Sequence, residues 1–331
     1  MKPTRKQLFT QGAIAMAVSL LFQSQPVLAN PTGAQVVNGT VSMARPNAAT
    51  LNVTNSPGAI INWQGFSIGA GEATRFIQQS SSSAILNRVV GQDISSIQGQ
   101  LTSNGRVFLI NPAGTIIGPN AMIDTAGFVG SALNMQNADF LAGKLRFSGD
   151  ATSGTIINQG WIRTSYGGNV LLVAPRIENS GLIQTPGGEL ILAAGQKLTI
   201  ASLEHEGVQF ELQAPTDAVV NVGKLLADGG AVGVFAGTIR HSGDIRANAL
   251  TRDEGGRIVL KAGGDVTLTS GSTTSANGKS GGTVTVQSQS GTTLVSGTVE
   301  ARGLLPLPPG IGIYTSPLRD PLAPLAGRGL G

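Results

Sequence analysis

Pairs of adjacent glycines recur along the second half of the chain, and each pair precedes a short apolar or alternating segment. Five of these pairs follow one another at 20, 42, 26 and 26 residues, so we expect the double interval to contain one repeat that lacks the pair. A period of this length, made of strand and turn, is typical of a solenoid. The five pairs with this spacing are Gly167-Gly168, Gly187-Gly188, Gly229-Gly230, Gly255-Gly256 and Gly281-Gly282.

Short strands of this kind constrain the fold because one rung cannot bury its own apolar side. Stacked rungs pair each strand with those above and below it, and glycine lets the backbone turn at the corners. We therefore predict an all-β chain that forms a right-handed parallel β-helix of about twelve rungs, with an N-terminal cap. A β-sandwich, which also contains many short strands, is the alternative.

The first 29 residues have the order of a secretory signal rather than of a folded segment. A basic start with Lys2, Arg5 and Lys6 precedes an apolar run from 12 to 22, which is too short for a membrane span. Small and apolar residues then lead to a predicted cleavage between Ala29 and Asn30. An uncleaved membrane anchor is the alternative.

Composition bounds the mature chain. There is no cysteine, which excludes disulfides and thiolate metal sites. Of the 22 basic residues, three lie in the predicted signal, leaving 19 against 18 acidic residues. The mature protein is therefore nearly neutral, and we predict no nucleic-acid partner. Residues 303–331 contain repeated Pro and Gly and are predicted to be an extended or disordered tail.

The segment from Ser103 to Gly118 combines four apolar residues with the turn sequence Asn111-Pro112-Ala113-Gly114. This pattern predicts a strand buried on both faces, followed by a surface turn in which Asn111 makes an Asx-type bond. Nearer the N-terminus, we expect Trp63, Phe66 and Ile68 to line the interior.

Several segments flank this turn in a characteristic order: 83–91 (Ser-Ala-Ile-Leu-Asn-Arg-Val-Val-Gly), 97–101 and 121–131. In this order and spacing, residues from about 34 to about 145 resemble the N-terminal secretion domain of two-partner secretion exoproteins, the filamentous haemagglutinin family. The high-molecular-weight adhesins and heme–hemopexin-binding proteins form the most similar branch. The family usually has Asn-Pro-Asn-Gly where this chain has Ala113 in the third position, which questions a role for that side chain but not the turn.

The resemblance implies a division into the signal (1–29), a secretion domain that begins the β-helix (30–150), further β-helix repeats (151–302) and the tail (303–331). It also implies a secreted or cell-surface exoprotein of a Gram-negative bacterium, exported through the periplasm. Its partner would be the periplasmic modules of a dedicated outer-membrane β-barrel transporter. We expect a monomer that binds a host-surface or extracellular ligand as an adhesin or haemagglutinin. The residues expected to serve transporter recognition are Asn87, Arg88, Asn111, Pro112 and Gly114, which could instead only shape the fold.

No constellation of catalytic residues is evident. Two G-x-S-x-G matches, at 65–69 and 278–282, do not precede a helical pattern, so a hydrolase site is not supported. The only histidines are His205 and His241, without metal-site spacing, and a lone histidine of this kind is usually a solvated surface residue. We predict no enzyme activity, no metal and no cofactor. A heme-capture protein and a β-helical polysaccharide-active enzyme are the alternatives, but the scattered acidic residues argue against the enzyme.

Overall fold

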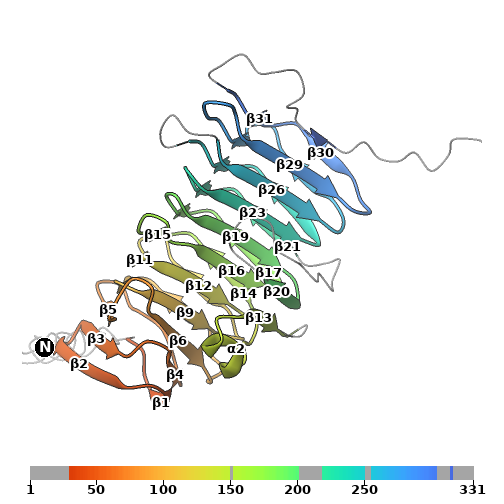
Figure 1. Ribbon diagram of the computed structural model, residues 1–331. Helices are drawn as coiled ribbons and strands as arrows, with labels where there is room; N and C mark the ends of the chain where they lie inside the picture. Colours follow the sequence, from red (N-terminus) through yellow and green to blue (C-terminus); the bar gives the residue numbers. More distant parts are fainter. Residues whose placement is uncertain (1–29, 150–151, 201–217, 250–254, 304–313, 316–331) are drawn as a thin grey trace, which may run out of the picture.

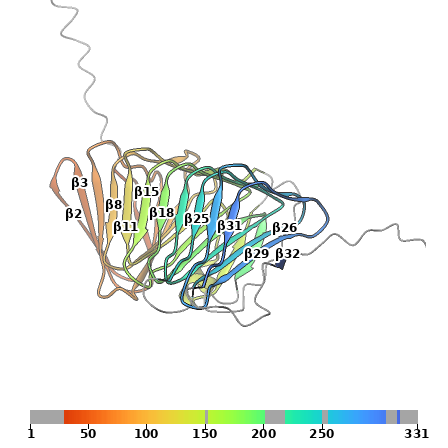
Figure 2. The same cartoon turned by 90° about the horizontal axis from the view of Figure 1, so that it is seen from above.

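A computed structural model describes residues 30–149, 152–200, 218–249, 255–303 and 314–315 of the 331-residue chain. Within them, short strands stack into three long sheets that wind around a common axis (Figures 1 and 2). After the N-terminal cap, strands within these three sheets pair in parallel with the strands before and after them. The predicted all-β class and parallel β-helix are confirmed.

The first sheet contains the strands that follow the glycine pairs, and in rungs nearer the N-terminus the segments carrying the recognition residues. Its strands are β1 (Gln35–Asn38), β4 (Ala59–Trp63), β6 (Ala84–Val89), β9 (Arg106–Ile110), β12 (Gly127–Ser131), β16 (Val170–Ala174), β19 (Glu189–Ala194), β23 (Ala231–Ala236), β26 (Arg257–Ala262), β29 (Thr283–Ser288) and β32 (Tyr314–Thr315).

The second sheet runs along another side of the helix, as seen from above in Figure 2. Its strands are β2 (Val41–Asn47), β3 (Thr50–Asn55), β5 (Ala73–Ile77), β8 (Gln100–Ser103), β11 (Met122–Thr125), β15 (Trp161–Thr164), β18 (Leu182–Gln184), β22 (Lys224–Leu226), β25 (Asp244–Arg246), β28 (Thr273–Ser275) and β31 (Thr298–Glu300).

The third sheet completes each full rung. Its strands are β7 (Ser95–Ile97), β10 (Thr115–Ile117), β14 (Thr155–Asn158), β17 (Arg176–Asn179), β21 (Ala218–Asn221), β24 (Thr238–His241), β27 (Val266–Leu268) and β30 (Thr293–Val295). At the N-terminal end, β1 and β2 pair antiparallel with β4 and β3 and form the predicted cap.

The described residues form fewer rungs than the sequence suggested. The second sheet has eleven strands in the described residues and one of them, β2, is antiparallel, which leaves ten parallel strands rather than about twelve. The repeat expected in the 42-residue interval does not exist, because β19 pairs directly with β23. The extra length instead includes β20 (Lys197–Ile200), which leaves the helix and pairs antiparallel with β13 (Leu145–Ser148).

Apolar side chains form two separate cores. The inward-facing residues of all three sheets make one continuous interior, which includes Trp63, Phe66 and Ile68 as predicted. A second core lies on the outer face of the first sheet, where α2 (Asn137–Leu141), β13 and β20 cover it (Figure 1). The strand β9 serves both cores, since Val107 and Leu109 face inward while Phe108 and Ile110 face outward.

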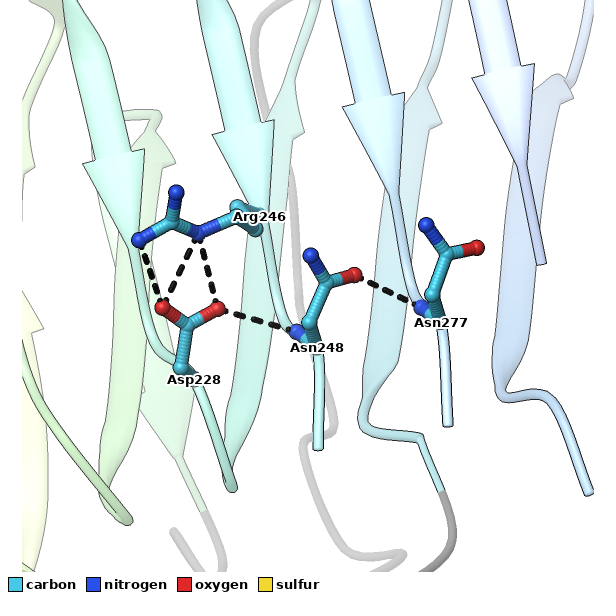
Figure 3. Close-up of polar contacts among 4 residues, drawn as sticks. All are labelled: Asp228, Arg246, Asn248 and Asn277. Atoms are coloured by element: carbon cyan, nitrogen blue, oxygen red, sulfur yellow. Dashed lines mark hydrogen bonds and ion pairs between the residues drawn. The ribbon is translucent and has the colours of Figure 1, made fainter. Parts of the chain in front are cut away.

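The corners between the second and first sheets are stacked like the strands. The Oδ1 atom of Asp228 accepts the N–H of Asn248 at 3.1 Å, and the Oδ1 atom of Asn248 accepts the N–H of Asn277 at 2.7 Å (Figure 3). The guanidinium of Arg246 holds the Asp228 carboxylate in place, with Nε 2.9 Å from each oxygen. Each side chain thus satisfies a backbone donor of the following rung, where the loops would otherwise leave it unpaired.

Much of the predicted tail, at 304–313 and 316–331, lies outside the described residues. Tyr314 and Thr315, which are described and lie within this tail, extend the first sheet by pairing in parallel with β29. The domain division at residue 150 stays a prediction. Strand pairing continues across that position, because β12 pairs with β16.

Candidate functional site

Asn111 follows β9 at the corner between the first and third sheets. Its Oδ1 atom accepts the N–H of Ala113 at 3.0 Å, which is the predicted Asx-type bond. Its Nδ2 atom donates to the carbonyl oxygen of Asp93 at 3.0 Å and to the Oγ atom of Ser95 at 2.9 Å. The side chain of Asn111 is fully buried, whereas Pro112 and Ala113 are half-buried, so the expected surface position is wrong for Asn111.

The rest of this turn is fixed by backbone bonds. The N–H of Gly114 donates to the carbonyl oxygen of Asn111 at 2.9 Å, and the carbonyl oxygen of Pro112 accepts the N–H of Gly154 in the next rung at 2.7 Å. Gly114 has φ of +105°, and a Cβ atom there would lie 2.6 Å from the carbonyl oxygen of Thr155. Glycine is therefore required at this position, and the turn forms with Ala113 in place of the family's usual Asn.

Asn87 lies on β6, one rung before Asn111, and points into the helix between Ile61 and Leu109 in the strand register. Its Oδ1 atom accepts the indole N–H of Trp63 at 3.0 Å, and its Nδ2 atom donates to the carbonyl oxygen of Phe108 at 3.2 Å. It is fully buried, and its amide satisfies a tryptophan N–H that would otherwise be unpaired in the apolar interior.

Arg88 is the next residue and points to the opposite face of the sheet. Its Nη1 atom donates to Oδ1 of Asn137 at 2.8 Å and its Nη2 atom to the carbonyl oxygen of Met135 at 2.6 Å. Partial burial lowers the pKa of the guanidinium, which still remains charged because an arginine is not deprotonated in proteins. Arg88 thereby fastens the start of α2 to the outer face of the first sheet.

The structure brings the five predicted recognition residues into adjacent rungs, but not onto one surface. Arg88 is opposite Ile110 in the β6–β9 register, so Asn111 lies one residue and Pro112 two residues beyond that pair. Asn87 faces the interior, Arg88 faces the outer core, and Asn111 closes the corner. In the folded protein, Asn87, Asn111 and Gly114 present little surface to a partner.

The predicted cleavage site falls at the edge of the described residues. Ala29 lies outside them, and Asn30 is the first residue described. The side chain of Asn30 is buried, with Oδ1 accepting from the hydroxyl of Thr74 at 3.0 Å and Nδ2 donating to the carbonyl oxygen of Ala49 at 3.3 Å. Cleavage after Ala29 stays a prediction.

A second set of buried polar side chains was not expected from the sequence. Asn158, Asn179, Asn221 and His241 occupy the same register position on four successive strands of the third sheet. The Nδ2 atom of Asn158 donates to Oδ1 of Asn179 at 2.7 Å, and Nδ2 of Asn179 donates to Oδ1 of Asn221 at 2.7 Å. The expectation that a lone histidine is solvated is wrong for His241, which is fully buried, while His205 lies outside the described residues.

This amide ladder did leave a signal in the sequence. Each of its members lies two residues after Ile or Val and two residues before Gly, as in Ile177-Glu178-Asn179-Ser180-Gly181. A polar residue that recurs at one position of a solenoid repeat predicts a stacked ladder, because equivalent positions lie on top of one another.

Neither G-x-S-x-G match has the geometry of a nucleophile elbow. Ser67 is followed by β5 and Ser280 by β29, so neither serine sits on a strand-to-helix turn. Among the described residues, no group of three or more His, Asp or Glu side chains could hold a metal ion. The same residues contain no helix that is long and apolar enough to span a bilayer.

Comparison with known proteins identifies the family to which the chain belongs. The family model of the TPS secretion domain matches residues 28–286. The chain belongs to the two-partner secretion domain family. The resemblance seen in the segments around Asn87 and Asn111 is therefore confirmed, and the match extends beyond the region from which it was inferred. Proteins of this family are secreted across the outer membrane of Gram-negative bacteria, and so is this one.

The solved structures agree with the fold. The secretion domain of HMW1 from Haemophilus influenzae has a TM-score of 0.75 and 32% sequence identity, and the match covers 83% of this chain and 84% of that chain. The filamentous hemagglutinin secretion domain has a TM-score of 0.54 at 13% identity, covering 82% and 98% of the two chains, and supports the fold alone.

A curated relative is the heme/hemopexin-binding protein of Haemophilus influenzae strain Rd, which is 29% identical over 235 residues. A second heme/hemopexin-binding protein from the same species is 30% identical over 131 residues. These matches cover 68% and 39% of this chain, but only 24% and 14% of the relatives. The chain thus matches at most about a quarter of the length of the curated relatives.

Proposed function

We propose that this domain directs export of its exoprotein by binding the periplasmic modules of a dedicated outer-membrane β-barrel transporter. The single observation that supports this most strongly is the family match over residues 28–286. The recognition residues within it are proposed to be Asn87, Arg88, Asn111, Pro112 and Gly114.

Burial determines when such recognition takes place. Asn87 and Asn111 are fully buried, and each makes hydrogen bonds to atoms of neighbouring strands or turns. A transporter can contact these side chains only before the first rungs have stacked. We therefore propose that it reads the segments around Asn87 and Asn111 in an unfolded or partly folded chain.

Folding on the far side of the membrane then helps to drive export. Each new rung buries apolar surface against the previous one, and burial contributes roughly 25 cal/mol per Å². In a solenoid this gain accrues rung by rung, because each repeat contacts only its neighbours. The corner bonds of Asp228, Asn248 and Asn277 follow the same order, since each side chain accepts a backbone N–H from the rung that emerges after it.

The test compares two buried asparagines. Asn111→Ala removes an amide that bonds to Asp93 and Ser95, and Asn179→Ala removes one that bonds to Asn158 and Asn221. Both should lower stability by about 1–3 kcal/mol, because polar partners are left unsatisfied in the interior. We expect Asn111→Ala to lower secreted yield well beyond the loss that its urea midpoint accounts for, and Asn179→Ala to lower it only in step with stability.

Equal secretion of the two variants at equal stability would show that the turn only shapes the fold. Co-purification with the isolated periplasmic modules provides a direct second measurement. Unfolded wild-type chain should bind, folded chain should bind weakly, and unfolded Asn111→Ala chain should bind less than unfolded wild type.

The exoprotein is proposed to act outside the cell as an adhesin that binds a host or extracellular ligand, with heme capture as a second candidate. The names of the curated relatives favour the second candidate. Both ring nitrogens of His241 are already engaged inside the helix, so this histidine would not ligate heme in the folded protein. Titration of the secreted protein with heme, followed by its absorbance spectrum, separates the two candidates.

We propose that the described β-helix is not an enzyme. A polysaccharide-active enzyme needs carboxylates placed together on one face, free to transfer protons. Several of the described acidic side chains are instead paired with arginine: Asp124 with Arg163, Glu178 with Arg176, Asp228 with Arg246 and Glu300 with Arg302. Release of reducing sugars from a panel of polysaccharides would contradict this proposal.

A further inference from the structure

The amide ladder ends at His241, and the surroundings of this imidazole fix its protonation state. Its Nε2 atom lies 3.2 Å from the carbonyl oxygen of Thr273, which can only accept, so Nε2 carries the proton. Its Nδ1 atom lies 3.3 Å from the N–H of Gly243 and 3.1 Å from Nδ2 of Asn221, which both donate. His241 is therefore neutral, with the proton on Nε2.

Protonation of Nδ1 would turn this hydrogen-bond acceptor into a donor. Two donors, the N–H of Gly243 and the amide of Asn221, would then face a third donor inside the helix. The one acceptor nearby is the carbonyl oxygen of Asn221, at 3.4 Å from Nδ1. The charged ring would lie in an interior bounded on the next strand by Leu268, which is opposite His241 in the register.

Few charges surround His241. The packed strands β21, β27 and β28 carry no ionisable side chain. On β25, Asp244 favours the charged imidazole and Arg246 is held by Asp228. Lys224 lies opposite Asp244 on β22, and Arg240 precedes His241 on β24, where it is exposed.

We propose that His241 makes the stacked rungs around β21, β24 and β27 an acid-sensitive joint, which loosens at mildly acidic pH while the rungs before Asn158 stay packed. The ladder confines the effect, because Asn158 is opposite Ile117 and no polar side chain continues the ladder into the previous rung.

The direction of the pH effect follows from linkage. Burial lowers the pKa of His241 and outweighs the backbone carbonyls of Thr273 and Asn221 and the charge of Asp244, which raise it. In the unfolded chain a histidine titrates near about 6.5. Below that pH, the unfolded state binds more protons than the folded state. The free energy of unfolding therefore decreases as the pH falls from about 6.5 to the lower pKa of His241 in the folded state.

The test uses the fact that the whole chain has only two histidines. Urea unfolding of the secreted protein is measured at pH 7.5 and pH 5.5 for wild type, His241→Asn and His205→Asn. Asparagine continues the amide ladder without a titrating ring. We expect wild type and His205→Asn to show a lower urea midpoint at pH 5.5, and His241→Asn to show no such shift.

A second measurement holds even if His241→Asn folds poorly. Nuclear magnetic resonance of wild type reports the imidazole tautomer and its titration, and hydrogen exchange reports the protection factors of the Gly243 and Ile123 amides. The protection factor of Gly243 should decrease on acidification, while that of Ile123, which lies on β11 in a rung before Asn158, should not. The proposal is overturned if His241→Asn retains the midpoint shift, or if His241 titrates without a decrease in the protection factor of Gly243.

Discussion

Buried amides are used differently in the N-terminal rungs and in the rungs of the ladder. Asn87 and Asn111 each bond to local backbone and to one unique side chain, and they make no bond to each other. Asn179, in contrast, bonds to its equivalents in the rungs before and after. The N-terminal rungs therefore specify individual corners, whereas the ladder rungs specify only that successive rungs stack in register.

The largest effect should come from the glycine that shapes the Asn111 corner. Gly114→Ala combines φ of +105° with a Cβ atom 2.6 Å from a backbone oxygen, whereas Gly143→Ala has φ of +67° and no atom within 4 Å of the new Cβ. We expect a loss of at least about 3 kcal/mol for Gly114→Ala and about 1 kcal/mol for Gly143→Ala. Urea unfolding measures both, and equal losses would mean that the corner can rearrange.

The contrast between single anchors and a ladder can be measured by double-mutant cycles. Asn179→Ala and Asn221→Ala remove partners of the same bond, so their losses, about 2 kcal/mol each, should be non-additive by roughly 0.5–2 kcal/mol. Asn87→Ala and Asn111→Ala share no bond and should add within about 0.5 kcal/mol. Coupling of the second pair as large as that of the first would remove the distinction between the two regions.

A smaller and local effect is expected for Arg88→Met. The change leaves the carbonyl oxygen of Met135 and the amide of Asn137 without their donor, but keeps an apolar stem against the sheet. Hydrogen exchange of α2 should accelerate about tenfold, equivalent to about 1.4 kcal/mol, with the interior strands unchanged. Faster exchange in β6 and β9 as well would show that Arg88 supports the rungs themselves.

The smallest effect is expected on the outer surface of the second sheet. Asp124 pairs with Arg163, and both side chains keep a third or more of their surface exposed. Because solvent screens such pairs, Asp124→Asn should change the free energy of unfolding by less than about 1 kcal/mol. A larger loss, measured by urea unfolding at low salt and at 0.5 M salt, would show that surface charges help to hold the rungs in register.

How well the sequence predicted each region depended on repetition. The glycine pairs located β16, β19, β23, β26 and β29 in advance, because a solenoid places equivalent residues on one edge. The same assumption of regularity predicted a hidden repeat between Gly188 and Gly229, where the chain instead makes an excursion. Spacing along the sequence cannot distinguish an additional rung from a segment that leaves the β-helix when both have the length of a repeat.

The candidate site shows a related limit. The Asx bond of Asn111 and the need for Gly114 could be predicted, since both follow from the chemistry of four consecutive residues. The burial of Asn111 could not, because it depends on Asp93 and Ser95, which the preceding rung brings to it. The position of His241 could not be predicted for the same reason. The residues around it in the sequence do not reveal that it ends a ladder that begins 83 positions earlier at Asn158.

The excursion between β19 and β23 has a consequence for protein engineering. Glu189 and Ala231 are paired neighbours although 42 positions separate them, and the strands on either side keep an unshifted register. The length of the connection between β19 and β23 therefore does not affect how the strands of the β-helix pair. We therefore expect a foreign epitope inserted between β20 and β21 to leave the register of the neighbouring strands unchanged.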